Sequence, residues 1–182
     1  MSEISDRYDT VAAGFATRLA GVAPEEWTAP TPCPDWTVRD LVVHVIGTQR
    51  GVLTRLDGTE PVGVEPGGDL PAQFRQASQA IADALADATR ALTIVGGMLG
   101  EQSFESLVGR LVCTDLLVHT WDLARATGQD ETLDPGAVAS SEALLVSIDD
   151  AIRVPGGFAP KIAPAINADD QTRFLNFSGR AV

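Results

Sequence analysis

The sequence predicts an all-α fold, a bundle of long helices forming one domain over residues 1–182. Apolar residues recur at helical spacing in five long segments, and stretches rich in proline and glycine separate these segments. The alternation of strand and helix that indicates a parallel sheet is absent from the sequence. With 182 residues, of which 45% are hydrophobic and 21% charged, the chain is long enough to bury one substantial core.

Local signals delimit each of the five predicted helices. Ser5 or Asp6 can cap the first helix, and Pro71 suits the first turn of the third. The apolar stripe of each helix is wide enough to face a common core. In chain order, the predicted helices cover about residues 5–22, 37–57, 71–92, 103–127 and 134–152.

The boundaries of the second, fourth and fifth helices are marked most clearly. The Thr37 hydroxyl can cap the second helix while Asp40, three residues later, bonds back to the Thr37 backbone, as in a capping box. Gly128 suits the left-handed position that ends the fourth helix. Asp134 and Pro135 form an N-cap and first-turn pair at the start of the fifth helix.

The remaining segments are predicted to be irregular, apart from one short helix. Residues 23–36 hold four prolines, and residues 57–70 are rich in glycine and proline. Glycines break the chain again over residues 96–100. The tail from residue 155 is predicted to be loop or extended chain, with a short helix over residues 169–177.

The charge and the N-terminal sequence exclude several classes of function. A formal net charge of -12 and a pI of about 4.4 disfavour binding to nucleic acids and to anionic membranes. No apolar run approaches the roughly 20 residues that a transmembrane helix needs. The acidic N-terminus lacks the features of a secretory signal, so we expect a cytoplasmic protein.

The cysteines and tryptophans give little indication of a functional role. In a cytoplasmic protein, Cys33 and Cys113 are expected to be reduced thiols, and their separation in sequence excludes a zinc knuckle. Nothing in the sequence supplies a base beside Cys33, so we expect an unreactive thiol there. Trp36 and Trp121 are expected to be packing residues.

The two histidines and two nearby aspartates are the residues that can carry chemistry. Asp115, His119 and Asp122 share one face of the fourth helix, on a segment that is otherwise apolar. Burying a carboxylate costs several kcal/mol unless it is paired or binds a cation. If His44 from the second helix faces the same point, His44, Asp115 and His119 can hold a divalent metal ion. Two histidines and one carboxylate leave coordination positions for water or substrate.

These residues also have simpler explanations. Asp115 and His119 can form a helical ion pair that contributes a few tenths of a kcal/mol, with no metal. Asp122 can be a fourth ligand, a hydrogen-bond acceptor that orients His119, or a partner of Arg125 or Arg18. The orienting role is the one we expect.

Two motifs resemble those of a known family. One is TPCPDWTVRDLVVHVIG at residues 31–47 and the other is DLLVHTWDLARATG at residues 115–128. Both resemble the signatures of the mycothiol-dependent maleylpyruvate isomerase-like proteins, an actinobacterial branch of the DinB-like metal-binding superfamily. The closing segment over residues 157–180 is similar to that of the small single-domain subgroup.

The resemblance implies a DinB-like four-helix bundle of up-down-down-up topology, with an additional C-terminal helix and an irregular tail. It also implies a divalent metal, zinc or nickel, held by one histidine of the second helix and a pair spaced four apart. His44, Asp115 and His119 occupy these places. Relatives carry Glu or His where Asp115 stands, and Asp122 is the alternative ligand if the shorter Asp115 does not reach.

Three hypotheses about function follow. The first is a mycothiol-dependent transferase or isomerase acting on a small electrophile; the second is a non-catalytic metal-binding protein with a vestigial or stress-related role. The third is a structural bundle with a buried polar network. The characterised isomerases use a further C-terminal domain that this chain does not include, so we do not expect isomerisation of maleylpyruvate itself. A homodimer is expected by analogy.

Overall fold

The computed structural model describes residues 2–96, 100–153 and 158–182. Its internal contacts divide the chain into two compact units, Met1–Glu131 and Thr132–Val182. The single domain expected for the whole chain stays a prediction. None of the helices within the described ranges has the length and apolar character needed to cross a membrane.

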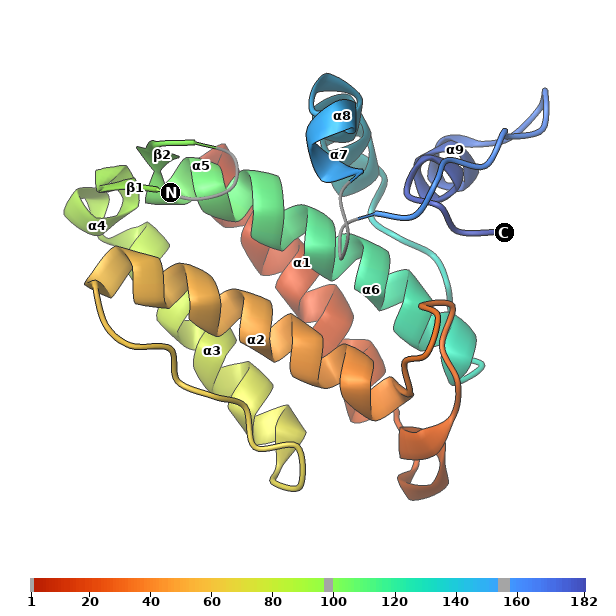
Figure 1. Cartoon of the computed structure of the whole chain (residues 1–182), viewed down its shortest axis with the longest axis horizontal. Helices are drawn as coiled ribbons and strands as arrows, with labels where there is room; N and C mark the ends of the chain where they lie inside the picture. Colours follow the sequence, from red (N-terminus) through yellow and green to blue (C-terminus); the bar gives the residue numbers. More distant parts are fainter. Residues whose placement is uncertain (1, 97–99, 154–157) are drawn as a thin grey trace. The chain divides into compact units, whose positions relative to one another are not determined.

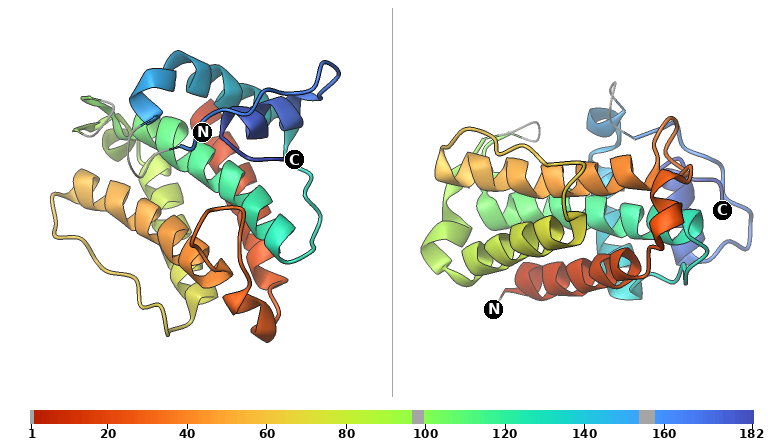
Figure 2. Two further views of the ribbon diagram at one scale, coloured as in Figure 1. Left: turned by 45° about the vertical axis from the view of Figure 1, so that its right-hand side comes forward. Right: turned by 90° about the horizontal axis from the view of Figure 1, so that it is seen from below.

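The first unit is a four-helix bundle. It consists of α1 (Glu3–Ala20), α2 (Val38–Asp57), α3 (Leu70–Ala86) and α6 (Cys113–Ala126). Both α1 and α2 pack against α3 and α6. In Figures 1 and 2, α1 and α6 run in one direction and α2 and α3 in the other. The all-α class and the up-down-down-up order implied by the family resemblance are therefore confirmed.

A long connection follows from the parallel arrangement of α2 and α3. The 20-residue helix α2 is about 30 Å long, and the chain must return over that length before α3 begins. Residues 58–69 can span up to about 40 Å when extended, so this loop is long enough. Gly58 begins the loop in the left-handed conformation, with φ of 63°.

The start of α2 matches the predicted capping box. The Thr37 hydroxyl accepts a hydrogen bond from the Asp40 N–H, and the Asp40 carboxylate accepts one from the Thr37 N–H at 2.9 Å. The Thr37 hydroxyl also donates to the Asp40 carboxylate, and the hydrogen bonds that the carboxylate accepts from the Thr37 hydroxyl and N–H hold the pKa of Asp40 below its usual value. The prediction for α1 was wrong: the helix begins earlier, and Ser2, not Ser5 or Asp6, is its N-cap.

The segment after α3 is more broken than the sequence indicated. The predicted third helix ends at Ala86, and a separate short helix, α4, covers Ala88–Leu92. The Asp87 carboxylate accepts hydrogen bonds from two backbone N–H groups of α4, which favours a new helix start there. A small antiparallel ribbon follows, formed by β1 (Ile94–Val95) and β2 (Gln102–Ser103).

Part of the predicted glycine break lies outside the described residues, namely residues 97–99. The fourth predicted helix, over residues 103–127, is not the single regular α-helix that the sequence indicated. It begins as α5 (Phe104–Leu107), passes through a π-helical turn, η2 (Val108–Val112), and continues as α6. The Cys113 N–H donates to the Val108 carbonyl, five residues back. A π turn contains an extra residue and changes the direction in which later side chains point. The turn thus sets the orientation of α6, which carries the predicted metal ligands.

A glycine in the π turn allows close packing against α1. A Cβ atom at Gly109 would lie 2.8 Å from Nη2 of Arg7 and 3.2 Å from Cγ2 of Ile4. The Gly109 carbonyl accepts a hydrogen bond from Arg7 at 3.3 Å. A side chain at this position would have to displace the end of the Arg7 side chain and press against Ile4 of α1.

The core of the bundle is largely apolar, and Gln49 is one of the polar residues buried in it. Phe15 and Phe74 pack with their ring centroids 4.9 Å apart. The Tyr8 hydroxyl donates to Oε1 of Gln49, and the Ser78 hydroxyl donates to the same oxygen, each at 2.9 Å. Burial raises the pKa of Tyr8 well above its usual value, so its hydroxyl stays protonated.

The second unit contains α7 (Pro135–Ser147), α8 (Asp149–Ile152) and α9 (Asp170–Phe177). Asp134 caps α7 as predicted, accepting from the Ala137 N–H at 2.8 Å. The fifth predicted helix is interrupted between α7 and α8, and the predicted short C-terminal helix corresponds to α9. Helix α7 packs against α9. Within the predicted tail, residues 154–157 lie outside the described part of the chain.

Candidate metal centre

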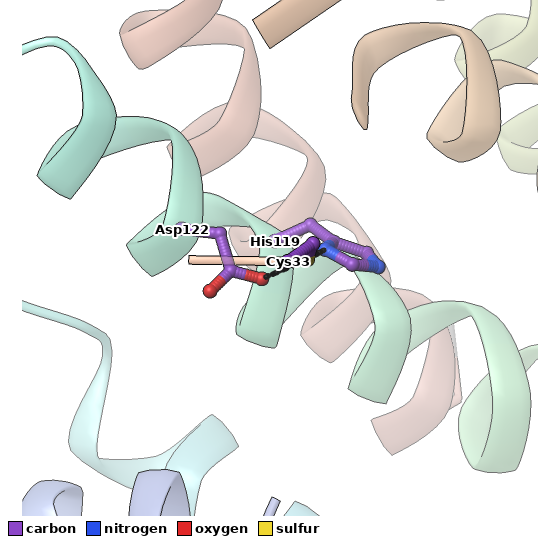
Figure 3. A group of neighbouring side chains, drawn as sticks. All are labelled: Cys33, His119 and Asp122. Atoms are coloured by element: carbon purple, nitrogen blue, oxygen red, sulfur yellow. Dashed lines mark hydrogen bonds and ion pairs between the residues drawn. The ribbon is translucent and has the colours of Figure 1, made fainter. Parts of the chain in front are cut away.

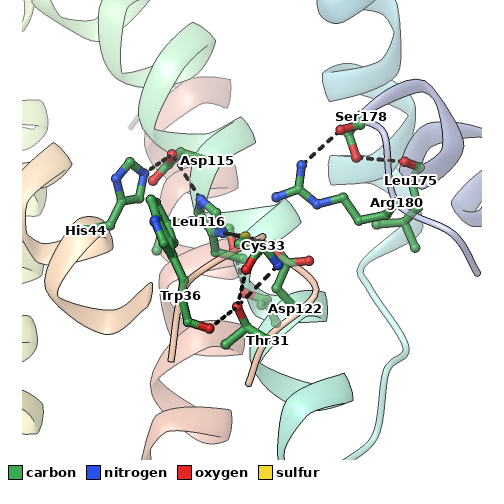
Figure 4. A network of polar contacts seen from close by, with 12 residues as sticks. Thr31, Cys33, Trp36, His44, Asp115, Leu116, Asp122, Leu175, Ser178 and Arg180 are labelled. Carbon is green, nitrogen blue, oxygen red and sulfur yellow. Dashed lines mark hydrogen bonds and ion pairs between the residues drawn. The ribbon is translucent and has the colours of Figure 1, made fainter. Parts of the chain in front are cut away.

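The three predicted ligands meet between α2 and α6. His44 lies two turns into α2, and Asp115 and His119 lie one turn apart on α6. Nε2 of His44 is 3.1 Å from Oδ1 of Asp115, and Nε2 of His119 is 3.6 Å from the same oxygen. One donor atom from each residue lies within 4.8 Å of the other two. Figure 4 shows the His44 ring directed at the Asp115 carboxylate.

The donor set fits a divalent transition metal. An ion with tetrahedral bonds of about 2.0–2.1 Å holds its nitrogen and oxygen ligands about 3.4 Å apart. The separations of 3.1 and 3.6 Å from Asp115 to the two histidines bracket this value. Imidazole nitrogens suit zinc and nickel, and a carboxylate adds negative charge. Although aspartate is shorter than glutamate, Oδ1 of Asp115 lies within reach of a shared ion. Ligation itself remains a prediction.

Asp122 lies on the opposite side of the His119 ring. Its Oδ2 atom is 2.9 Å from Nδ1 of His119, and its side chain is fully buried. A proton on Nδ1 that is donated to Asp122 leaves the lone pair on Nε2, the nitrogen that faces Asp115 and His44. This geometry agrees with an orienting role for Asp122. Arg18 forms an ion pair with Asp130.

Cys33 is a member of the site that sequence reasoning missed. Its thiol donates to Oδ2 of Asp122 at 3.3 Å, and its Sγ atom lies 3.9 Å from Nδ1 of His119 (Figure 3). No base beside this thiol was evident from the sequence, and the structure places the Asp122 carboxylate and the His119 ring there, while the unreactive thiol stays a prediction. No local signal could have found the contact, because Cys33 and Asp122 are 89 residues apart in sequence.

Cys33, His119 and Asp122 form a second group of donors close enough to hold a metal. The two groups share His119, but through different nitrogens. All three residues of this second group are buried, whereas His44 and Asp115 of the first group are partly exposed, so solvent and exchangeable ligands can reach the first group. We therefore take the group of His44, Asp115 and His119 as the candidate metal centre.

Trp36 covers the two histidines. Its ring centroid is 4.7 Å from that of His44 and 5.9 Å from that of His119. The two imidazoles meet edge to face, with centroids 5.0 Å apart. Trp36 was expected to be a packing residue, and the residues on which its ring packs are two of the candidate ligands. Trp121, in contrast, is buried as expected, with the Arg125 guanidinium over its ring.

Exposure increases across the site from Asp122 to His44. The side chain of Asp122 is 0% exposed, that of His119 9%, that of Asp115 15% and that of His44 36%. Solvent therefore reaches the centre from the His44 side. An exchangeable coordination position would face that side.

The second cysteine lies apart from this chemistry. Cys113 is buried beneath α1, and burial raises the pKa of its thiol to about 11. At neutral pH it is protonated and unreactive. Neither cysteine forms a disulfide, in agreement with the prediction of reduced thiols.

Residues from both predicted irregular segments, 23–36 and 57–70, line a cavity. It has a volume of about 500 Å³ and lies at the end of the bundle where α1 finishes. Trp27 comes from the first loop, Gly67 and Gly68 from the second, and the Arg39 guanidinium stacks on the Trp27 ring at 5.2 Å. The lining does not include the candidate ligands.

The bundle and the converging donors define the class: a helical protein with a candidate metal centre between two antiparallel helices. Residues 8–124 match the mycothiol maleylpyruvate isomerase N-terminal domain, and the chain belongs to this family. The matched segment lies within the first unit and includes every residue of the site, from Cys33 to Asp122.

Two curated relatives come from two strains of Mycobacterium tuberculosis, and both are named as uncharacterized proteins. Each is 37% identical to this chain over 122 residues, which cover 66% of the chain and 65% of the relative. The chain thus spans less than two thirds of the length of these relatives. No solved structure matches the chain significantly.

Proposed function

We propose that this protein binds one divalent metal ion through His44, Asp115 and His119 and uses it to activate a low-molecular-weight thiol, which then attacks a small electrophile. Zinc or nickel is the expected metal, and mycothiol is the thiol that the family suggests. The reaction class is transfer or isomerisation. The cytoplasmic location, the homodimer and the exclusion of nucleic acids remain predictions.

One observation carries the proposal. Three donor atoms of the types that bind zinc and nickel, from two different helices, lie within 4.8 Å of one another. Local sequence alone explains the pair on α6, because residues spaced four apart are neighbours on a helix. It does not explain why α2 directs a histidine to the same point. A shared ligand accounts for that convergence.

When bound, the ion would supply a Lewis-acidic position that binds a sulfur atom and lowers the pKa of the thiol. The residues of the chain prepare this position. Asp122 holds a proton on Nδ1 of His119, which keeps Nε2 available as a donor. Asp115 contributes the negative charge that balances the ion.

The remaining residues control access. Trp36 covers one side of the two imidazoles and keeps water away from their ring faces. His44 is the most exposed of the three donors, so a thiol and an electrophile would approach along its edge.

A polar network without metal is a second candidate, and one contact favours it. Nε2 of His44 is 3.1 Å from Oδ1 of Asp115, a distance at which the two residues can pair directly by sharing a proton. In that case the site would stabilise the contact between α2 and α6 and would have no catalytic role.

Metal analysis separates the two candidates. The purified protein, loaded with zinc or nickel and then desalted, should retain about one ion per chain, whereas His44→Ala and His119→Ala should each lose most of it. A metal content that is unchanged in both variants would rule out the proposed centre. Far-UV circular dichroism checks that the variants stay helical.

Thiol chemistry is then tested with mycothiol and a generic electrophile such as a chloronitrobenzene. The metal-loaded protein should consume the thiol faster than the metal-free protein, and His44→Ala should behave like the metal-free protein. Retention of metal without thiol consumption would identify a non-catalytic metal-binding protein.

A further inference from the structure

The loop before α2 makes two separate contacts with the candidate metal centre. We refer to residues 29–38 as the Thr31 loop. It carries Cys33, which contacts Asp122 and the Nδ1 edge of His119, and Trp36, which packs on the face of the same imidazole. One short segment therefore contacts His119 on two sides.

The Thr31 loop is held in shape by its own hydrogen bonds. The Thr31 hydroxyl donates to the Trp36 carbonyl at 3.0 Å and accepts from the Cys33 N–H at 3.2 Å. The Thr31 N–H donates to the Trp36 carbonyl and the Trp36 N–H to the Cys33 carbonyl. Asp35 takes the left-handed conformation, with φ of 64°, at the tight turn between them.

The base of the loop is also closed. The Val38 N–H donates to the Ala29 carbonyl at 3.0 Å, and Pro30 and Thr37 form an isolated antiparallel bridge. Figure 4 shows Thr31 bonded within the loop that carries Cys33 and Trp36. Hydrogen bonds within the loop therefore hold the backbone that carries both side chains.

Cys33 contacts a carboxylate that has no exposed surface. Oδ2 of Asp122 accepts from Nδ1 of His119 at 2.9 Å and from the Cys33 thiol at 3.3 Å. A buried carboxylate needs such donors, because each one replaces a hydrogen bond to water. Two donors on one oxygen also fix the direction in which the carboxylate points. A fixed carboxylate in turn fixes the tilt of the imidazole.

We infer that Cys33 is a positioning residue of the metal centre: its thiol holds Asp122, and Asp122 holds His119 with Nε2 directed at Asp115 and His44. The inference rests on the proposed function, because the orientation of Nε2 matters most when a metal binds there. Cys33 acts as a hydrogen-bond donor and does not ligate the ion. Partners of this kind typically change metal affinity by about 10–100-fold.

The test compares Cys33→Ala with Cys33→Ser, using Co²⁺ alone as the probe. Alanine removes the donor, and we expect about tenfold weaker Co²⁺ binding together with a shift of the visible Co²⁺ absorption bands. Serine keeps a donor at the same position, so we expect affinity and spectrum close to those of the wild type. Equal behaviour of alanine and serine variants would overturn the inference.

The same spectra show whether the thiol is itself a ligand. A thiolate bound to Co²⁺ gives an intense charge-transfer band in the near ultraviolet, and we expect none in the wild type. Its presence, and its loss in Cys33→Ser, would identify the second donor group as the metal site and would contradict the positioning role.

Two further measurements keep the test independent of folding and of the proposed function. If Cys33→Ala does not fold, Thr31→Val removes the hydroxyl that holds the loop while leaving the thiol in place. It should weaken Co²⁺ binding, and Thr31→Ser should restore it. Unchanged binding in Thr31→Val would then count against the inference.

Nitrogen-15 spectra of the histidine rings in the metal-free protein test the orientation directly. The wild type and Cys33→Ser should show His119 protonated on Nδ1, and Cys33→Ala (or Thr31→Val) should show a mixture of tautomers. Failure of the wild type to bind any metal, with this difference present, would reject the proposed function alone. The same tautomer in all variants would reject the role of Cys33 alone.

Discussion

The two ring nitrogens of His119 lie in different surroundings. On the Nδ1 side, Asp122 is fully buried and accepts a hydrogen bond from the Cys33 thiol. On the Nε2 side, Asp115 is 15% exposed and His44 36%. One side is a closed hydrogen-bonded group and the other is partly open to solvent.

This difference suits His119 to a place in the proposed metal centre. Hydrogen bonds on the closed side determine which nitrogen keeps its lone pair, and the open side offers that lone pair to a ligand that can exchange. If both sides were closed, substrate could not enter. If both were open, neither tautomer would be preferred.

The largest predicted effect concerns the rise in Tm on metal binding, compared between variants in which a carboxylate on either side of His119 is changed to an amide. At a metal concentration about a thousand times Kd, binding stabilises the wild type by about 4 kcal/mol, which raises Tm by about 8–16 °C. Asp115→Asn, which replaces a charged carboxylate ligand with a neutral amide, should abolish most of this rise. Asp122→Asn should weaken binding by about 10–100-fold and so reduce the rise by about 3–11 °C.

Thermal unfolding of each variant with and without zinc measures these effects. The metal-free Tm of the same variant serves as its control, so loss of stability from the mutation itself does not enter. A larger loss in Asp122→Asn than in Asp115→Asn would show that the ion binds on the closed side.

Tryptophan fluorescence gives a smaller and more local test of the open side. Ni²⁺ has an open d shell and quenches a nearby indole, whereas Zn²⁺ has a filled shell and does not. Because the Trp36 ring lies 4.7 Å from that of His44, Ni²⁺ should quench the wild type strongly. Trp36→Phe should lose most of this quenching while it still binds Ni²⁺. Equal quenching in both proteins would place the ion near Trp27 or Trp121 instead.

The capping box of α2 should have the smallest effect, on the helix that carries His44. Asp40→Ala should destabilise the metal-free protein by a few tenths to about 1 kcal/mol at pH 7, because the carboxylate interacts with the helix N-terminus. Since the pKa of Asp40 is lowered in the folded state, its contribution is present above the usual pKa of about 3.9. It is lost as the pH falls through the lower, folded-state pKa.

Urea unfolding at pH 7 and at pH 3 or below measures this dependence. The difference between wild type and Asp40→Ala should shrink at the lower pH. A difference that is the same at both values would mean that the Asp40 charge has no part in the cap.

Much of the fold was predictable because its signals are local. The Thr37 and Asp40 capping box, the Asp134 cap and the left-handed Gly128 each depend on residues within about one helical turn. The points that were predicted wrongly also depend on local signals, but at these points two local signals favour different structures. Asp87 started a new helix although the apolar stripe continued through it, because its carboxylate caps the next turn.

The π turn over Val108–Val112 had no recognisable signal. Its backbone conformation is less favourable than that of an α-helix in isolation, and packing of Gly109 against Arg7 accompanies it. Such a turn depends on the neighbouring helix, which the sequence of the segment does not contain.

The sequence by itself determined the bundle, the ends of most helices and the pairing of Asp115 with His119, because helical geometry places residues four apart on one face. Only the tertiary structure decided that His44 reaches the same point and that Cys33 and Trp36 contact His119. These contacts join segments more than 70 residues apart, and they exist only after α1, α2 and α6 have packed. Local rules describe neighbours along the chain, whereas the surroundings of the two nitrogens are set by packing between helices.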